Sequence, residues 1–252
     1  MKIEIPDRFL GKPIKGAMDK ILKEVPKREK SKNASPIVAP SSSNLTDADK
    51  YILLPSMQHG NYSYPDTLVS MEKNHFNKDW NKTHEVLKKE GAYMLTIRQF
   101  ADFLSLLKSG KAFDGTGKQL NKGKLENVLQ EITEVRDPWR SEWLDAKFED
   151  GNILYHKFDG STKTLVEVKE PLYNYIKTDK ESGISLSDWL KKANVHGLPT
   201  PKTNNGSLCY YAPVNGKVAG FYVGSGRALL YCVSSPANAV SSLGVRVARA
   251  KN

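Results

Sequence analysis

The clearest pattern of apolar and polar positions lies between residues 96 and 109. Thr96 stands three residues before Gln99, which is the spacing of a helix capping box, and Gly110 follows as a natural stop. Apolar residues recur between them at helical spacing. The pattern predicts an amphipathic helix from Thr96 to Ser109 whose buried face is formed by Phe100, Phe103, Leu104 and Leu107.

Three further segments have helical character. Lys124–Val135 carries apolar residues at i, i+3, i+4 and i+7, and Trp80–Lys89 ends just before Gly91. A short helix through Trp189 and Leu190 is expected to begin at Ser185 or Ser187. The segment from 139 to 148 holds two tryptophans four residues apart, which would share one face of a helix. Such a pair favours a core anchor over a ligand platform.

Short strands are expected in the rest of the chain. Ile153–Phe158 and Thr164–Val168 surround the turn Asp159-Gly160-Ser161, which indicates a hairpin. A second hairpin is predicted at Asn215-Gly216, the strongest two-residue turn signal in the sequence. The strands expected in this region are Cys209–Ala212, Lys217–Val223, Leu229–Val233 and Leu243–Ala248. The prediction is an α+β fold, with helices gathered before a small antiparallel sheet built by roughly the last 50 residues.

The composition of the first 46 residues differs from that of the rest. Apolar residues between Met18 and Val25 have helical spacing, but Pro26 ends any helix, and a Ser/Pro-rich stretch occupies residues 33–44. We interpret 1–46 as a basic tail and linker that could dock to a larger assembly. Residues 47–252 are predicted to form one domain, with helical support over about 47–150 and a sheet over about 151–252.

Length, composition and charge argue against a membrane-spanning, secreted or nucleic-acid-binding protein. The chain has 252 residues, of which 39% are hydrophobic, which is enough for a buried core. No apolar run reaches the roughly 18 residues of a membrane span, and the start has no signal-peptide core, so no secretion is expected. The net charge is +10, and residues 189–252 hold eight Lys/Arg and no acid. These cations are scattered singly, which favours a solvated surface over nucleic-acid binding.

Motifs for catalysis, cofactors or metals are scarce. No two of the five histidines are spaced at i+3 or i+4, and two cysteines cannot form a four-Cys zinc site, so we predict neither a metal site nor a cofactor. Gly224-Ser225-Gly226 is superficially like a dinucleotide turn, but a strand-like stretch follows where that turn needs a helix. Cys209 and Cys232 could form one disulfide or remain free. Without a secretion signal, we favour free thiols.

The C-terminal region carries a family resemblance. Its motifs occur in a specific order: Tyr210-Tyr211-Ala212-Pro213, Val218-Ala219-Gly220-Phe221-Tyr222, Ser225-Gly226-Arg227-Ala228-Leu229-Leu230-Tyr231-Cys232, then Leu243-Gly244-Val245-Arg246. Together they resemble the variable proteins of diversity-generating retroelements, most closely the archaeal and archaeal-virus kind. That resemblance implies a C-type lectin-like fold over about residues 50–252. The Gly-Val-Arg tripeptide near the terminus is also shared with formylglycine-generating-enzyme-like proteins of the same fold.

The resemblance implies a binding protein with hypervariable positions. In such systems, adenines are miscopied, typically at AAY codons, and the resulting NNY codons cannot specify Lys, Glu, Gln, Met or Trp. The segment Val218–Ala250 contains none of these five types, although a buried sheet also avoids Lys and Glu. Leu229, Tyr231 and Val233 alternate with Leu230 and Cys232, so one set should face the core and the other outward. The candidate ligand-binding residues are Tyr222, Gly224, Leu229, Tyr231, Val233, Ser234, Ala237, Ala239 and Ser242.

The expected function is therefore recognition without catalysis. The partner would be a protein or cell-surface ligand, and the resemblance implies a virion or a cell surface as location. Tyr222 and Tyr231 suit such a surface, because Tyr offers a large contact area at low entropic cost. Calcium-dependent sugar-binding motifs are absent from the sequence. Two alternatives stay open: a formylglycine-generating-enzyme-like oxidase that uses Cys residues, and a basic nucleic-acid-binding protein.

Overall fold

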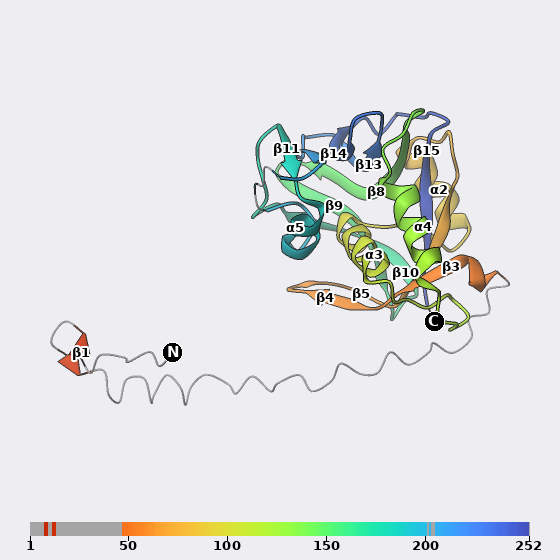
Figure 1. Ribbon diagram of the computed structural model, residues 1–252, viewed down its shortest axis with the longest axis horizontal. Coiled ribbons are helices and arrows are strands. Elements are labelled where there is room, and N and C mark those ends of the chain that lie inside the picture. Colours follow the sequence, from red (N-terminus) through yellow and green to blue (C-terminus); the bar gives the residue numbers. More distant parts are fainter. Residues whose placement is uncertain (1–7, 10–11, 14–46, 201, 203–204, 252) are drawn as a thin grey trace. The chain divides into compact units, whose positions relative to one another are not determined.

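The computed structural model describes residues 8–9, 12–13, 47–200, 202 and 205–251 (Figure 1). The chain divides into two units, Met1–Ala39 and Pro40–Asn252, and each is treated by itself. In the first unit, β1 (Arg8–Phe9) pairs antiparallel with β2 (Lys12–Pro13). The predicted helix between Met18 and Val25 and the Ser/Pro-rich connector lie outside the described residues.

A large, mostly antiparallel sheet organises the second unit. Its path runs β11-β12-β14-β13-β8-β15-β6-β3, with β7, β9 and β10 attached beside it. Two of the pairs, β12 with β14 and β15 with β8, are parallel. A separate hairpin joins β4 (Met57–His59) to β5 (Tyr62–Tyr64). The strands of the large sheet are β3 (Tyr51–Leu54), β6 (Thr67–Asn74), β7 (Tyr93–Met94), β8 (Arg140–Glu149), β9 (Asn152–Asp159), β10 (Thr164–Pro171), β11 (Lys180–Ile184), β12 (Leu208–Tyr211), β13 (Val218–Val223), β14 (Ala228–Ser234) and β15 (Leu243–Ala250).

The fold class is confirmed as α+β, but the expected arrangement of helices before a small C-terminal sheet is wrong. Strands from before residue 150 contribute much of the sheet, and β15 lies between β8 and β6. β15 is buried along most of its length, from Leu243 to Ala248. A strand buried on both faces is stable in the interior of a sheet, so the last strand pairs with elements from the first half of the chain.

The helices agree with the sequence pattern. They are α2 (Trp80–Lys89), α3 (Ile97–Ser109), α4 (Lys122–Thr133) and α5 (Leu186–Lys192), with a short 3-10 turn, η1, at Ala48–Lys50. Thr96 and Gln99 form the predicted capping box of α3, and Gly110 ends it in the left-handed region at φ 67°. Ser185 caps α5. None of the helices in the described part of the chain has the length and apolar character needed to cross a bilayer.

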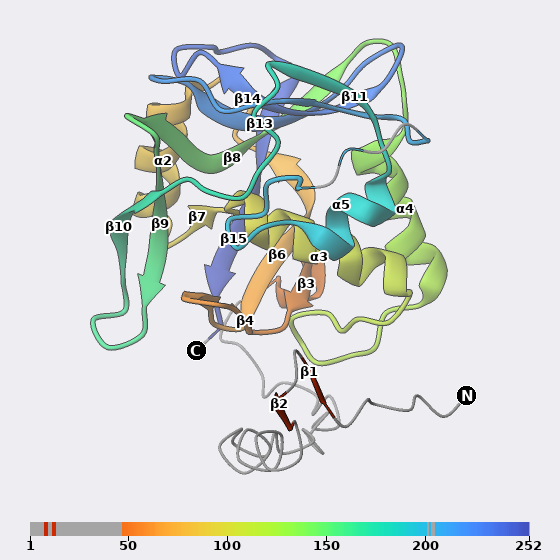
Figure 2. The same cartoon turned by 90° about the vertical axis from the view of Figure 1, so that its left-hand side faces the viewer.

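The helices cover the two faces of the sheet unequally (Figure 2). The buried side chains of α3, α4 and α5 share one core with Phe221 and Leu230 of the sheet. On the opposite face, α2 packs Trp80 and Leu87 against Trp143 of β8. Only α2 covers this second face among the described helices, so part of the face over β12, β13 and β14 remains accessible.

The segment from Trp139 to Phe148 forms a strand instead of a helix. β8 begins at Arg140, and its residues from 140 to 146 are all buried. Successive residues of a strand point to opposite faces, so the sheet and the helices around it bury both sides of this strand. Periodicity cannot distinguish such a fully buried strand from a buried helix. Trp143 is the expected core anchor at 1% exposure, whereas Trp139 is 42% exposed.

The turn at Asn215-Gly216 does not join two paired strands. β12 pairs with β11 and β14, and β13 pairs with β14 and β8. The turn instead contacts the β8–β9 connection, where Gly216 donates its N–H to the carbonyl of Phe148 and the Asn215 side chain accepts from the N–H of Asp150. The local turn was predicted correctly, but β14 lies between the two strands that flank it. The Ile153–Phe158 and Thr164–Val168 hairpin is confirmed, as β9 and β10.

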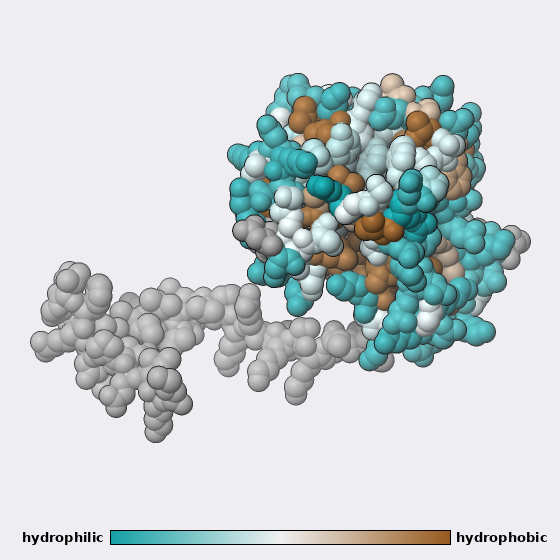
Figure 3. Space-filling view, turned by 45° about the horizontal axis from the view of Figure 1, so that its top comes forward, coloured by the Kyte–Doolittle hydropathy of each residue, from teal (hydrophilic) through white to brown (hydrophobic). Residues whose placement is uncertain are grey.

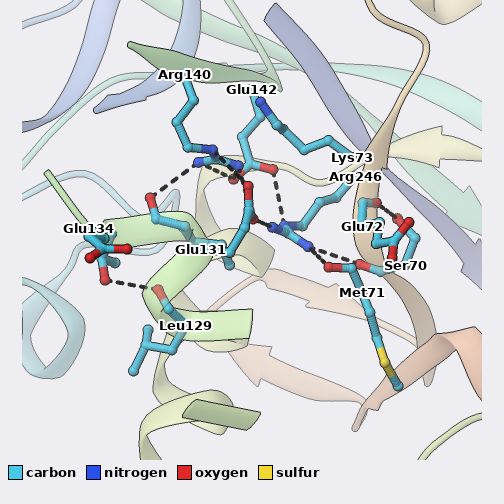
Figure 4. A network of polar contacts seen from close by, with 12 residues as sticks. Ser70, Met71, Glu72, Lys73, Leu129, Glu131, Glu134, Arg140, Glu142 and Arg246 are labelled. Atoms are coloured by element: carbon cyan, nitrogen blue, oxygen red, sulfur yellow. Dashed lines mark hydrogen bonds and ion pairs between the residues drawn. The ribbon is translucent and has the colours of Figure 1, made fainter. Parts of the chain in front are cut away.

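A buried ion-pair network joins β8, β15 and α4 (Figure 4). Arg246 Nε lies 3.1 Å from Glu142 Oε2, and Arg140 Nη2 lies 3.2 Å from Glu142 Oε1. Glu131 contacts both arginines. Burial by itself would raise the pKa of Glu142, but Arg246, Arg140 and Lys73 lower it overall. The arginine of the Gly-Val-Arg tripeptide therefore attaches the last strand to the middle of the sheet.

Candidate ligand-binding surface

Four aromatic side chains form a continuous row on the open face of the sheet. Trp139 stacks on Tyr222 with ring centroids 5.9 Å apart, Tyr222 meets Tyr231 at 5.2 Å, and Tyr231 meets Tyr211 at 4.9 Å. We call these four residues the aromatic row. Strand register produces it, since Tyr211 lies beside Tyr231 in the β12–β14 pair and Tyr231 lies opposite Gly220 in β13. The row crosses three neighbouring strands and reaches the start of β8.

The predicted alternation along β14 is confirmed. Leu230 and Cys232 have no exposed surface, while Leu229, Tyr231 and Val233 are half-buried. On the inward side of the neighbouring strand β13, the ring centroids of Phe221 and of Phe100 in α3 are 5.1 Å apart. The inward set therefore belongs to the core, and the outward set is accessible from the open face.

Two neighbours position the Tyr222 ring. A Cβ atom at Gly220 would stand 2.7 Å from Cε2 of Tyr222, so the ring occupies the space that a side chain at residue 220 would need. The Tyr222 hydroxyl lies 2.7 Å from Oγ of Ser234. Burial is the main cause that raises the pKa of Tyr222. The ring therefore has packing and polar contacts on two sides.

The nine nominated residues differ in exposure. Ser234 is buried and contacts the Tyr222 hydroxyl, and Ala237 and Ala239 are exposed in the β14–β15 connection. The other six are half-buried: Tyr222, Gly224, Leu229, Tyr231, Val233 and Ser242. Tyr222, Leu229 and Tyr231 lie on the paired strands of the row, and Ser242 lies near Trp139 in an adjoining groove.

Trp139 and Tyr211 belong to the row, although neither was nominated from the sequence. A signal for Tyr211 was present in the Tyr210-Tyr211 pair, because adjacent strand residues face opposite sides. Tyr210 is fully buried, which leaves its neighbour on the open face. For Trp139 the sequence interpretation as a core anchor is wrong, because its side chain is 42% exposed.

Basic groups lie at both ends of the aromatic row. Beside Trp139 is an open groove of about 560 Å³ lined by Lys73, Arg136 and Ser242, among others. Burial, together with Arg140, lowers the pKa of Lys73 to about 8. At the other end, Lys180 Nζ lies 5.6 Å from the centre of the Tyr211 ring. Figure 3 brings this side of the molecule forward and shows pale and apolar residues between hydrophilic ones.

The cysteines are free and buried, as predicted. Cys209 and Cys232 lie on β12 and β14, which are neighbouring strands. Burial raises the pKa of Cys232. A thiol in that state is mostly protonated near neutral pH and is a weak nucleophile.

The histidines fall into two groups. His59 lies 2.8 Å from Asp102, and His196 lies 2.7 Å from Glu170, so each has a carboxylate partner of its own. His75 likewise lies 3.2 Å from Glu90. His84 and His156 both contact Asp145, a cluster that the sequence did not predict because 72 residues separate the two histidines. Burial would raise the pKa of Asp145, but contacts with the two imidazoles lower it to about 2.

Comparisons with family models, with curated proteins and with solved structures find no match to this chain. Its function therefore has to be inferred from the geometry of the surface itself, together with the order of its sequence motifs.

Proposed function

We propose that this protein is a ligand-binding display protein with a C-type lectin-like domain, of the kind diversified by a retroelement. The observation that carries the proposal is the aromatic row, which lies on the open face of the strands that hold the nominated variable positions. Tyr and Trp supply large, rigid contact areas and often dominate the binding energy of protein interfaces. The resemblance of the C-terminal motifs supports the finer assignment of fold and family.

The framework under the row suits a surface whose side chains are exchanged. Phe221, Leu230 and Cys232 are fully buried and pack toward α3 and α5. Replacing an outward side chain on the same strands leaves those contacts in place, because strand residues alternate between the faces. Recognition could therefore change without refolding of the sheet.

The shape and charge of the surface favour a protein partner. A row across neighbouring strands presents a broad contact area, whereas small molecules usually bind in concave pockets. Arg136 at one end and Lys180 at the other favour partners with acidic groups around the contact, although Asp137 also lines the groove beside Trp139. We therefore propose a protein or cell-surface ligand whose apolar centre covers the tyrosines.

The deciding experiment is to sequence the 3′ end of this gene, with its flanking DNA, in many individuals of the source population. We expect substitutions at outward positions such as Leu229, Tyr231 and Val233, beside an adenine-bearing near-repeat. The inward residues Leu230 and Cys232 serve as matched internal controls and should not vary. An invariant 3′ end without such a repeat would remove retroelement diversification and leave a fixed binding surface.

The two alternatives have weaker support. A Cys-dependent oxidase needs a reactive thiol, and the burial of Cys232 works against one. Activity lost in Cys232→Ser, with thiols that titrate in the native protein, would establish it. For nucleic-acid binding, Arg246 is unavailable because it is buried in ion pairs. Retention on heparin that falls steeply with salt would support this alternative.

A further inference from the structure

We propose that His84, Asp145 and His156 form a binding site for a divalent transition-metal ion of the zinc type. The three residues come from α2, β8 and β9, and one potential ligand atom of each lies within 4.8 Å of the other two. Two imidazoles and one carboxylate are a common protein ligand set for Zn²⁺. The site does not depend on the aromatic row or on the proposed display function.

Local structure fixes each of the three side chains. His84 lies one helical turn after Trp80, whose ring centroid is 4.2 Å away and whose indole N–H donates to the carbonyl of Leu144. Asp145 has no exposed surface and accepts the backbone N–H of His156 at 2.7 Å. The three positions are therefore held before any ion arrives, which lowers the entropic cost of binding.

The two distances from Asp145 suit a tetrahedral ion, while the two imidazole nitrogens lie within 4.8 Å of each other and would approach further around an ion. Asp145 Oδ1 lies 3.3 Å from His84 Nε2 and 3.1 Å from His156 Nδ1. Metal–ligand bonds of about 2.0–2.1 Å place neighbouring ligands of a tetrahedron roughly 3.3–3.4 Å apart. A metal ion could therefore be accommodated with small movements of the side chains.

One buried nitrogen of the cluster makes only a long contact. His84 Nε2 lies 3.3 Å from Asp145 Oδ1, and the geometry of this contact is poor for a hydrogen bond. A buried polar atom without a well-formed hydrogen bond costs free energy, and a metal ion would satisfy it. Asp145 and His156 would supply the other two ligand atoms to the same ion.

The surroundings favour a cation and place the cluster near the surface. Glu167 lies opposite His156 in the β9–β10 pair and adds negative charge, although Lys88 nearby partly offsets it. The His84 and His156 side chains are 15% and 26% exposed, so the cluster lies near the surface, although His84 Nε2 and Asp145 are themselves buried. The nitrogen-rich set favours Zn²⁺, Co²⁺ or Ni²⁺ over Mg²⁺ and Ca²⁺. A bound ion would clamp α2 to β8.

The test uses the full chain, with any affinity tag removed and metals stripped by a chelator. The probes are Zn²⁺ in calorimetry and Co²⁺ in visible absorption. We expect one equivalent to bind, a Co²⁺ spectrum typical of tetrahedral nitrogen and oxygen ligands, and a higher melting temperature with Zn²⁺. His84→Gln and His156→Gln should each weaken binding by more than about tenfold, since loss even of an outer-shell partner costs that much.

His75→Gln is the matched control, because His75 pairs with Glu90 at 3.2 Å outside the cluster. It should bind Zn²⁺ like the unmodified chain, as should Cys209→Ser. Histidine side-chain NMR of the unmodified chain provides a readout that needs no variant: the ring signals of His84 and His156 should shift on Zn²⁺ addition while that of His75 does not. The absence of stoichiometric binding, or binding retained by both cluster variants, would overturn the proposal.

Discussion

Arg246 and Glu142 form an ion pair in which both side chains are only 1% exposed, with Nε and Oε2 3.1 Å apart. The pair joins the last strand of the chain to a strand that begins about 100 residues earlier. Glu142 also faces Arg140, so one carboxylate lies between two guanidinium groups. Taking such charges out of water is costly, and the arrangement persists only because each charge has an opposite neighbour.

Removing the central carboxylate should therefore destabilise the protein strongly. We expect Glu142→Gln to lower the free energy of unfolding by about 3–5 kcal/mol, because it leaves two buried arginines with Glu131 as their remaining acidic partner. Urea unfolding followed by circular dichroism measures the change. Glu126→Gln is the control, since Glu126 pairs with Lys122 in an exposed position and should have little effect. Equal stability of the two variants would contradict this view of the network.

Lys73 should make the stability of the protein depend on pH in the alkaline range. The pKa of Lys73 is lowered from 10.5 to about 8 by burial and Arg140, while Glu142 and Glu131 oppose the shift and Arg246 adds to it. Between these two pH values the unfolded chain holds a proton that the native chain has lost, so native stability rises with pH.

The measurement compares the unmodified chain with Lys73→Met by urea unfolding at several pH values. The unfolding free energy of the unmodified chain minus that of Lys73→Met should increase from about pH 8 to about pH 10.5. It should be constant below pH 7. The comparison removes the contribution of other groups that titrate in the same range. A difference that does not change with pH would show that Lys73 keeps an ordinary pKa.

A display surface requires that outward positions tolerate change better than inward ones. Leu230→Ala should lower the free energy of unfolding by about 2–5 kcal/mol, since it opens a cavity in the core. Tyr231→Ala, on the adjacent outward position, should cost clearly less because the ring is half-buried and packs on the exposed side against Tyr211 and Tyr222. Thermal and urea unfolding of the two variants measure both losses of stability. A larger loss for Tyr231→Ala would mean that the tyrosines form part of the core.

Gly220 should control the position of the Tyr222 ring. In Gly220→Ala, the new methyl group would stand 2.7 Å from Cε2 of Tyr222, so the ring has to move. We expect a loss of stability of about 1 kcal/mol, at the lower end for overpacking because a ring can shift, and altered aromatic NMR signals of Tyr222 and Tyr231.

Gly224→Ala is the matched control for Gly220. A Cβ atom at residue 224 would make only an ordinary 3.6 Å contact with Trp139. In a Tyr222→Ser background, Gly220→Ala should cost much less than in the unmodified chain, because the colliding ring is gone. An equal cost of Gly220→Ala in the Tyr222→Ser background and in the unmodified chain would show that the lost stability does not come from the Tyr222 ring.

Features that depend only on residues close together in the chain could be predicted from the sequence. The capping box at Thr96 and the apolar face of α3 are local signals, since the groups that satisfy the helix end lie within one turn. The alternation of Leu229, Leu230 and Tyr231 follows in the same way from the geometry of a single strand. The free state of both cysteines was also predictable.

Features that depend on which strands become neighbours could not be predicted from local patterns. The Asn215-Gly216 turn was visible, yet β14 separates the strands around it, because pairing is settled by the burial of whole strands and not by one turn. Trp139 and Trp143 are only four residues apart in the sequence. Trp143 nevertheless packs against α2 in the core, whereas Trp139 is 42% exposed. The cluster of His84, Asp145 and His156 likewise exists only once a helix and two strands meet. Contacts between distant residues depend on the packing of the whole domain, and no local pattern of side chains encodes them.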